Sequence, residues 1–279
     1  MRQVRTTFET LLYEEDDGVA TVTLNRPEVH NSFNILMQRE MRELWTALRL
    51  HDDVRTVILT GAGEKAFCAG IDRQELIEQS YLEKKEPHPL QAGFLGTPFM
   101  YNDPGVSINP KANDLWKPVI AAVNGMACGG AFYMLGEADI IIAADHATFF
   151  DPHVTYGMVS GFDAMHLLQK LPLGETLRVA LLGAHERMSA ARAHQLGLVS
   201  EVVPAEELMD RARWVASAIA SAPVHAVQGT LRAIWMAHDL SRREAMAHVS
   251  SYVSLGTQFE DIESGQARFR DERIEWRLR

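Results

Sequence analysis

Two short glycine-containing segments are the first candidates for chemistry. Residues 66–72 read AFCAGID and residues 118–131 read PVIAAVNGMACGGA, and each places small residues where a predicted strand passes into a helix. A ligand can approach the backbone closely there, and the first N–H groups of a helix have no internal partner. Two such amides converging on one point would form an oxyanion hole, which stabilises negative charge on a carbonyl oxygen. Taken singly, either segment could serve only a tight turn or close helix packing.

Three side chains near or after the second segment could move protons. Tyr133 follows the Gly129-Gly130 pair by about one helical turn, which would bring its hydroxyl near the same point. His153 titrates close to neutral pH and is a natural acid or base, and Asp163 could orient its ring. Other roles stay open: Tyr133 could pack in the core with its hydroxyl bonded, Asp163 could cap a helix, and His153 could line a pocket without titrating.

The elements that must position these residues follow an α/β pattern. Apolar alternation and β-branched residues predict strands at 18–24, 54–60, 119–123, 140–143 and 148–150. Helical spacing predicts a helix at 33–50, capped by Asn31 or Ser32, and a helix start within 125–136. The rest is predicted to be helical, at 163–171, 173–182, 189–195, 205–222, 224–239 and from 244 into the charged tail. We therefore predict an α/β core followed by an all-helical end.

Composition excludes several classes of protein. The chain has 279 residues, of which 47% are hydrophobic, and a formal net charge of -10, which argues against a nucleic-acid surface. Its two cysteines, Cys68 and Cys128, form neither a disulfide framework nor a CxxC metal or redox motif. The N-terminus lacks a signal-peptide core, and the most apolar stretch is too short and interrupted to span a membrane. We expect a reduced, cytoplasmic protein.

Taken together and in this order, the two segments resemble the crotonase (enoyl-CoA hydratase/isomerase) family. Further matches are Leu24-Asn25-Arg26-Pro27 with Asn31-Ser32, the run Gly136-Glu137-Ala138-Asp139-Ile140, and Gly197-Leu198-Val199 before Glu201-Val202-Val203-Pro204. These matches cover nearly the whole chain, and their combination is highly specific.

The resemblance implies a fold, a substrate class and an assembly. Residues 1–200 would form a spiral core of repeated ββα units, and residues 201–279 a C-terminal helical region that assembles trimers or dimers of trimers. The substrate would be an acyl-CoA whose thioester oxygen is held by the backbone N–H groups of Ile71 and Gly130, which would stabilise an enolate or oxyanion. No metal and no cofactor is implied beyond coenzyme A as part of the substrate.

The resemblance also implies which residues bind coenzyme A. They lie in the loop after the first predicted strand, around the two glycine segments, and in the last helix, which often reaches the nucleotide of a neighbouring subunit. Arg273 in that helix could equally be a solvated residue of the charged tail. The residues carried over are Arg26, Val29, His30, Ala69, Gly70, Asp72, Arg73, Gly129, Phe269 and Arg273.

The sequence departs from the family's hydratases at the acid–base positions. Hydratases use two glutamates to hold a water and deliver a proton, whereas this chain has Tyr133 and His153 there. The spacing of Asp151, His153 and Asp163 resembles, with Asp163 offset by one position, the branch that cleaves β-diketones by retro-Claisen chemistry.

Three interpretations follow from this departure. The chain could be an acyl-CoA lyase, hydratase or isomerase, a hydrolase of a thioester or β-dicarbonyl, or a non-catalytic CoA-binding subunit. A long loop at 86–117 is expected to cover the acyl end of the pocket and to set acyl preference. Its apolar and aromatic residues include Phe94, Leu95, Phe99, Met100, Tyr101 and Trp116.

Overall fold

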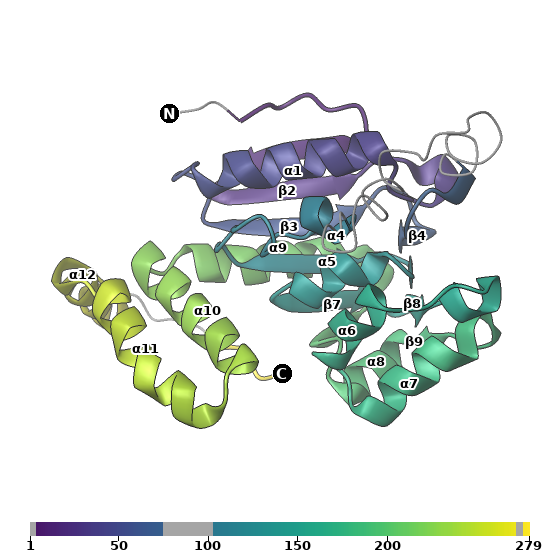
Figure 1. Cartoon of the computed structure of the whole chain (residues 1–279). Coiled ribbons are helices and arrows are strands. Elements are labelled where there is room, and N and C mark those ends of the chain that lie inside the picture. The colour runs from purple at the N-terminus through teal and green to yellow at the C-terminus, as the bar shows by residue number, and fades with distance from the viewer. Residues whose placement is uncertain (1–3, 75–102, 272–275) are drawn as a thin grey trace.

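The protein is built around a six-stranded sheet, seen in Figure 1 for a computed structural model that describes residues 4–74, 103–271 and 276–279. Its strand order is β1-β2-β3-β5-β7-β10, with β1 antiparallel to β2 and every other neighbouring pair parallel. The strands are β1 (Leu11–Asp16), β2 (Val19–Leu24), β3 (Thr56–Gly61), β5 (Val119–Val123), β7 (Ile140–Ala144) and β10 (Glu201–Val203).

Helices cover both faces of this sheet. The helix α1 (Ile35–Arg49) packs in one hydrophobic cluster with Val57 and Leu59, and α9 (Leu208–Ala220) packs in a second cluster with Ile58. Because successive strand residues point to opposite faces, β3 contributes side chains to both clusters and is buried along its whole length.

A second, smaller sheet carries the segments singled out from the sequence. Its strands β4 (Ala66–Cys68), β6 (Met126–Cys128) and β8 (Thr148–Phe150) run parallel, and β9 (Met188–Ser189) pairs antiparallel with β8. Each of the three parallel strands follows a strand of the large sheet, so the chain repeats a strand–strand unit, as predicted. Because parallel strands end at the same edge, the residues after Cys68, Cys128 and Phe150 are brought together.

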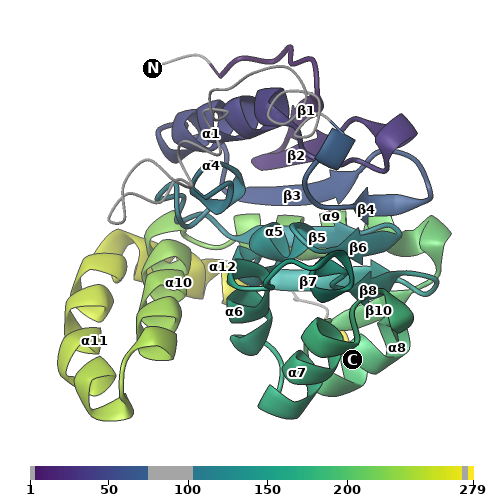
Figure 2. The ribbon, with the colours of Figure 1, turned by 45° about the vertical axis from the view of Figure 1, so that its right-hand side comes forward.

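The remaining helices complete the core and form the C-terminal part (Figure 2). The α10–α11 pair packs together and extends from the core. In the described part of the chain no helix is both long and apolar enough to cross a membrane. The helices are α4 (Gly105–Ile108), α5 (Ala131–Glu137), α6 (Phe162–Leu168), α7 (Leu173–Leu182), α8 (Ala190–Leu196), α10 (Val224–Asp239), α11 (Arg242–Gly256) and α12 (Phe259–Asp271), with 3-10 turns at Pro27–Val29, His153–Tyr156, Gly183–His185 and Ala205–Glu207.

The predicted cap of the first helix was wrong. Asn34 caps α1 by accepting a hydrogen bond from the Met37 amide at 2.9 Å. Asn31 is instead buried in the left-handed region, with φ of 57°. Its side chain accepts from the Arg26 amide at 3.0 Å and donates to the Ala66 carbonyl oxygen at 2.8 Å. Because the Asn31 side chain is used in these two hydrogen bonds between loops, it does not cap α1.

Other predicted boundaries also need correction. The expected helix start at residues 125–136 begins with strand β6, and the helix α5 starts only at Ala131. Strand β10 interrupts the all-helical end, and the final segment divides into α11 and α12 after Gly256. Strand β1 was not predicted because its outward side chains are mostly acidic.

The expected 86–117 loop lies partly outside the described residues, as do Phe94, Leu95, Phe99, Met100 and Tyr101. The described part from residue 103 packs against the core: Ile108 and Leu115 are fully buried, and Trp116 is half-buried. This part contains the one-turn helix α4. Its proposed role at the acyl end stays a prediction.

Candidate active site

The two glycine segments meet at the edge of the small sheet. Gly70 has φ of +83°, and a Cβ placed on it would come within 2.9 Å of the Gly130 amide nitrogen and 3.0 Å of the Cys128 carbonyl oxygen. Only glycine satisfies both the backbone conformation and this close approach. The two glycine turns therefore lie side by side, and their role as an oxyanion hole stays a prediction.

Both candidate oxyanion amides are available. Phe33 forms a parallel β-bridge with Ile71. The bridge consists of two hydrogen bonds, from the Phe33 amide to the Gly70 carbonyl oxygen at 2.9 Å and from the Asp72 amide to the Phe33 carbonyl oxygen at 3.0 Å. The Ile71 N–H takes no part in either bond. Gly130 occupies the N-cap position of α5, where no intrahelical acceptor exists. Within the described ranges neither N–H donates to a protein acceptor. Such unpaired, pre-oriented donors are what an oxyanion hole requires.

His153 lies directly beside the second glycine turn. A Cβ on Gly129 would stand 3.5 Å from the His153 Cε1 atom, so the imidazole packs against the backbone that precedes Gly130. Its Nδ1 is 2.5 Å from Asp151 Oδ1, which also accepts the His153 amide at 3.1 Å. The Ser160 hydroxyl donates to the other oxygen of Asp151. Asp151 thus fixes the ring orientation, a role that the sequence pattern suggests for Asp163.

Asp163 faces the opposite nitrogen of the same ring. Its Oδ2 lies 3.6 Å from His153 Nε2, while its Oδ1 is buried without any hydrogen-bond partner. The carboxylate is 3% exposed. The alternative of a helix cap is wrong, because Gly161 holds the N-cap position of α6 and no side chain caps that helix. A buried carboxylate with an unused oxygen is expensive to keep, which favours a chemical role.

The ionisation of the three groups is coupled. Burial alone would raise the pKa of Asp151, but hydrogen bonds from His153 and Ser160 outweigh it and hold that pKa below its usual value. The hydrogen bond to Asp151 raises the pKa of His153, against the effect of burial. Burial raises the pKa of Asp163 to about 6. The facing pair therefore combines an imidazole and a carboxyl group that both hold a proton more strongly than usual.

Tyr133 is held by a carboxylate that sequence analysis missed. Its hydroxyl donates to Asp103 Oδ2 at 2.7 Å, and its ring stacks on Phe162 with centroids 6.4 Å apart. Burial raises the pKa of Asp103, although the Tyr133 and Gly105 donors partly offset this effect. Asp103 lies in an irregular segment with no motif around it, and Ser160 in a glycine-rich turn, so no pattern marked either residue.

The predicted CoA loop is folded onto the first glycine segment. The Ala69 amide donates to His30 O at 3.0 Å, and Arg26 forms an ion pair with Asp72 at 2.8 Å. Val29 is half-buried in the adjoining 3-10 turn, and His30 lines a cavity of about 460 Å³. Arg73 places its guanidinium 4.0 Å from the centre of the Tyr156 ring. The structure thus brings the predicted residues from 26 to 73 together around one side of the candidate site.

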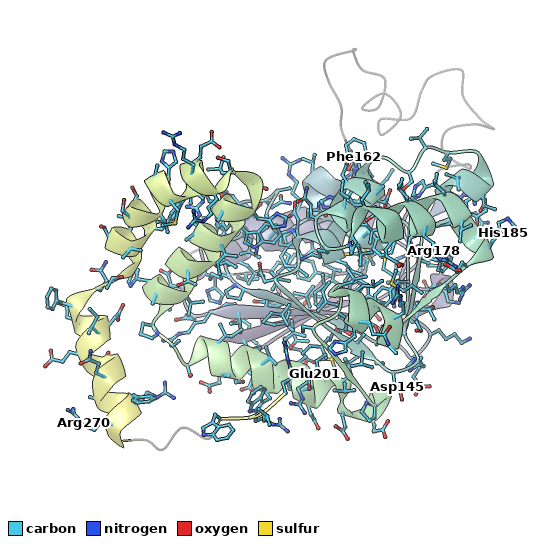
Figure 3. The ribbon with its side chains drawn as sticks, turned by 90° about the horizontal axis from the view of Figure 1, so that it is seen from below. Asp145, Phe162, Arg178, His185, Glu201 and Arg270 are labelled. Atoms are coloured by element: carbon cyan, nitrogen blue, oxygen red, sulfur yellow. The ribbon has the colours of Figure 1, made fainter. Side chains whose placement is uncertain are left out.

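The C-terminal CoA candidates are not brought to this site within the chain. Phe269 is 73% exposed on α12, which lies away from β4 and β8 in both ribbon views. Figure 3 likewise shows Arg270, its neighbour, far from Phe162, the residue before Asp163. Arg273 lies outside the described residues. The expectation that a second subunit receives this helix stays a prediction.

The site contains few groups for a metal. Asp151, His153 and Asp163 each offer one ligand atom, and these atoms lie within 4.8 Å of one another. His153 Nδ1 is already bonded to Asp151, which leaves two free ligands rather than the three protein ligands of catalytic zinc sites. The donor set fits a metal poorly, and the sequence expectation of a metal-free site stays a prediction.

Comparison with known proteins decides the family. The family model for enoyl-CoA hydratase/isomerase matches residues 14–277. The chain belongs to the enoyl-CoA hydratase/isomerase family. It is 33% identical over 261 residues to the (E)-benzylidenesuccinyl-CoA hydratase of Thauera aromatica, covering 93% of this chain and 95% of that protein. It is 34% identical over 270 residues to the carnitinyl-CoA dehydratase of Proteus mirabilis, covering 94% and 96%.

Solved structures of this family confirm the predicted crotonase-like α/β fold. An enoyl-CoA hydratase/isomerase from Mycobacterium paratuberculosis superimposes with a TM-score of 0.82 at 34% identity, covering 98% of this chain and 99% of the other. A second structure, an enoyl-CoA hydratase subunit from Geobacillus kaustophilus, gives a TM-score of 0.80 at 29% identity, covering 97% and 98%. The chain is therefore an acyl-CoA enzyme of the enoyl-CoA hydratase/isomerase family.

Proposed function

We propose that this family member reversibly adds water to the double bond of an enoyl-CoA, with His153 and Asp163 in the roles of the missing glutamates. The observation that supports this proposal most strongly is the buried carboxylate of Asp163. One of its oxygens has no hydrogen-bond partner, and the other lies 3.6 Å from His153 Nε2. Two facing groups with different proton affinities supply the acid and the base that hydration needs. Two relatives that are named for hydration or dehydration support this choice.

The thioester is held by the main chain in this proposal. The N–H groups of Ile71 and Gly130 bind the thioester oxygen and stabilise the enolate that forms as water attacks. The rest of coenzyme A lies along Arg26, Val29, His30, Ala69, Gly70, Asp72, Arg73 and Gly129, with Phe269 and Arg273 supplied by another subunit. Coenzyme A enters as part of the substrate, and no other cofactor takes part.

The proton balance uses only the facing pair. Ionised Asp163 takes a proton from water as its oxygen bonds to the β-carbon, and protonated His153 gives its Nε2 proton to the α-carbon. The α,β double bond becomes a single bond, and Asp163 is left protonated beside a neutral His153. Proton transfer across the 3.6 Å between them restores the starting state. Asp151 keeps the ring aligned, and Tyr133 with Asp103 supports the first turn of α6 through Phe162.

The test is turnover of an enoyl-CoA panel in H₂¹⁸O, with products identified by mass spectrometry. The panel runs from crotonyl-CoA to longer, branched and aromatic acyl groups. We expect an ¹⁸O-labelled hydroxyacyl-CoA with its thioester intact. His153→Gln and Asp163→Asn should each lower kcat by about 10²–10⁴-fold, whereas the exposed His185→Gln and Asp210→Asn should retain wild-type rates. Activity should fall below about pH 6 as Asp163 is protonated, and again at alkaline pH as His153 loses its proton.

A hydrolase is the second candidate because the Asp151–His153 pair resembles the carboxylate–imidazole pair that activates water. Free CoA or a shortened acyl chain from β-keto acyl-CoAs, lost in His153→Gln, would identify it and reject hydration. Tight CoA binding without turnover across the panel would identify a non-catalytic subunit. Unchanged hydration in both variants would reject the assigned acid and base.

A further inference from the structure

Phe33 contacts both halves of the candidate oxyanion site. It lies in the segment between β2 and α1 and is 1% exposed. Its backbone bonds to Gly70 and Asp72, on either side of Ile71. Its ring packs against the second glycine segment, where a Cβ placed on Gly130 would lie 2.6 Å from Phe33 Cζ and 2.8 Å from Phe33 Cε1. A single side chain and its backbone therefore meet the chain at both proposed donors.

The phenyl ring fills the space between the two glycine turns. The Cβ position on Gly130 that the ring occupies also lies 3.3 Å from Gly70 Cα, so the ring and both glycines pack together. A buried phenyl ring is rigid and is held in one rotamer by close packing. Because the backbone of Phe33 is bonded around Ile71, the length of its side chain sets how near the first turn of α5 can come to Ile71.

Two asparagines fix the backbone on either side of Phe33. The buried side chain of Asn31 donates to the carbonyl oxygens of Ala62 at 3.0 Å and Ala66 at 2.8 Å, which ties the segment to the chain that leads into β4. After Phe33, the side chain of Asn34 caps α1. Because the backbone is held on both sides, a change in the Phe33 side chain is expected to be taken up at the glycine turns.

We infer that Phe33 is a positioning residue for the two amides that bind the thioester oxygen. Its backbone holds the Ile71 N–H in place, and its ring sets the distance from there to the Gly130 N–H. This inference rests on the thioester-binding part of the proposed function, and Phe33 takes no part in proton transfer. With a shorter side chain the first turn of α5 shifts, and the two donors no longer meet one oxygen with good hydrogen-bond geometry.

The test is isotope-edited infrared spectroscopy of hexanoyl-CoA, labelled with ¹³C at its carbonyl and bound to the full-length protein. The saturated acyl group cannot be hydrated, and hydrogen bonds to the thioester oxygen lower its C=O stretching frequency. Wild type should lower this frequency relative to free hexanoyl-CoA, and Phe33→Leu should lose most of the shift. Phe33→Leu should also lower kcat/KM on an enoyl-CoA that wild type hydrates by about tenfold to 10²-fold, because small displacements of positioned groups cost that much. Its affinity for free CoA, which has no thioester carbonyl, should stay near that of wild type.

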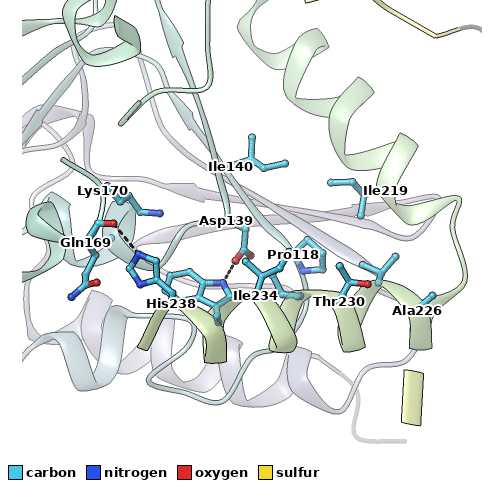
Figure 4. A pocket seen from close by; sticks show the side chains of 14 residues that line it. Pro118, Asp139, Ile140, Gln169, Lys170, Ile219, Ala226, Thr230, Ile234 and His238 are labelled. Carbon is cyan, nitrogen blue, oxygen red and sulfur yellow. Dashed lines mark hydrogen bonds between the residues drawn. The ribbon is translucent and has the colours of Figure 1, made fainter. Parts of the chain in front are cut away.

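Ile140→Ala provides the matched control, since it removes as many side-chain carbon atoms as Phe33→Leu. Ile140 begins β7 and lines a cavity of about 560 Å³ between α10 and the core, and none of the described residues around this cavity belongs to the candidate active site (Figure 4). Ile140→Ala should lower the thermal unfolding temperature and keep the carbonyl shift of wild type. Phe33→Met, whose unbranched chain fills more of the space than leucine, should lose less of the shift, and it keeps the test valid if the leucine variant does not fold.

Three results would overturn the inference. A wild type that binds no acyl-CoA, or binds it without a carbonyl shift, would reject the two amides as donors and with them the thioester-binding part of the proposed function. A wild-type shift that both Phe33 variants retain in full would reject the inference alone and leave the proposed function standing. An equal loss of the shift in Ile140→Ala and Phe33→Leu, both shown by circular dichroism to be folded, would assign the effect to core packing in general.

Discussion

A carboxylate that is buried with one oxygen unpaired lowers the stability of a fold, and Asp163 is such a group. Its pKa is about 6 in the folded protein against 3.8 for an ordinary aspartate. Between these values the folded state binds more protons than the unfolded state, so this group makes the free energy of unfolding fall as pH rises. Above pH 6 the full effect is present, roughly 3 kcal/mol at about 1.36 kcal/mol per pKa unit.

Asp163→Asn should therefore be more stable than wild type at pH 7, while the two proteins should be similar near pH 4. Asparagine keeps the shape of the side chain but removes the buried charge. Urea unfolding at several pH values measures the difference, and Asp210→Asn, an exposed replacement, provides the baseline. A difference between Asp163→Asn and wild type that stays constant from pH 4 to pH 7 would contradict the raised pKa.

At the scale of elements, the ends of β4 and β6 hold the two proposed main-chain donors, the amides of Ile71 and Gly130, close together. The backbones of Gly70 and Gly130 approach so closely that any side chain on Gly70 meets an amide nitrogen at 2.9 Å. Gly197 has a similar φ of +89° but open space around its Cα. Gly70 and Gly197 thus share a left-handed backbone conformation, but only Gly70 has other atoms packed against its Cα.

Gly70→Ala should lower kcat/KM on the true substrate by about 10²-fold or more, because it moves a donor of the oxyanion hole. Gly197→Ala carries the same backbone strain without the collision and should lose stability while keeping kcat near that of wild type. Steady-state kinetics together with thermal unfolding separates the two effects. Equal kinetic losses in both variants would show that strain alone, and not the geometry of the amides, is responsible.

The sequence predicted what depends on local backbone chemistry. Gly70 and Gly130 follow strands and stand in recognisable motifs, so their convergence was expected. The sequence was a poorer guide to the partners of His153. It indicates Asp163 as a neighbour of the ring, but the carboxylate that orients the ring is that of Asp151. The role of Asp151 depends on how the 3-10 turn at His153–Tyr156 directs the side chains, which spacing along the chain does not specify. Asp103 reaches Tyr133 only through the tertiary fold, so no sequence pattern could have revealed it.

At the scale of the whole molecule, α7 presents an uncovered apolar row. Leu173, Leu177 and Leu181 recur every four residues on one face of the helix and are 61%, 47% and 66% exposed. Isolated exposed leucines are ordinary, but a continuous row on one helix face is typical of an interface. This row supports the proposed homo-oligomer, a trimer or dimer of trimers.

Leu181→Glu should therefore shift the protein toward smaller species, because it places a charge within an apolar contact. Light scattering coupled to size-exclusion chromatography measures the mass of each species. Leu12→Glu, the same replacement at a 48% exposed position on β1, should leave the mass unchanged. A stable monomer in the wild type would reject the assembly altogether.

In the proposed mechanism the thioester is held by amides of the main chain, whereas the proton chemistry depends on a few side chains at the end of β8 and the start of α6. These two tasks can therefore change independently during evolution. On this proposal, substitutions at 133, 153 and 163 should alter which bond reacts, yet leave the donors at 71 and 130 in place. A gene library varied at only these three positions should contain many folded proteins that retain thioester binding and differ in their products, so new reactions would be accessible in single mutational steps.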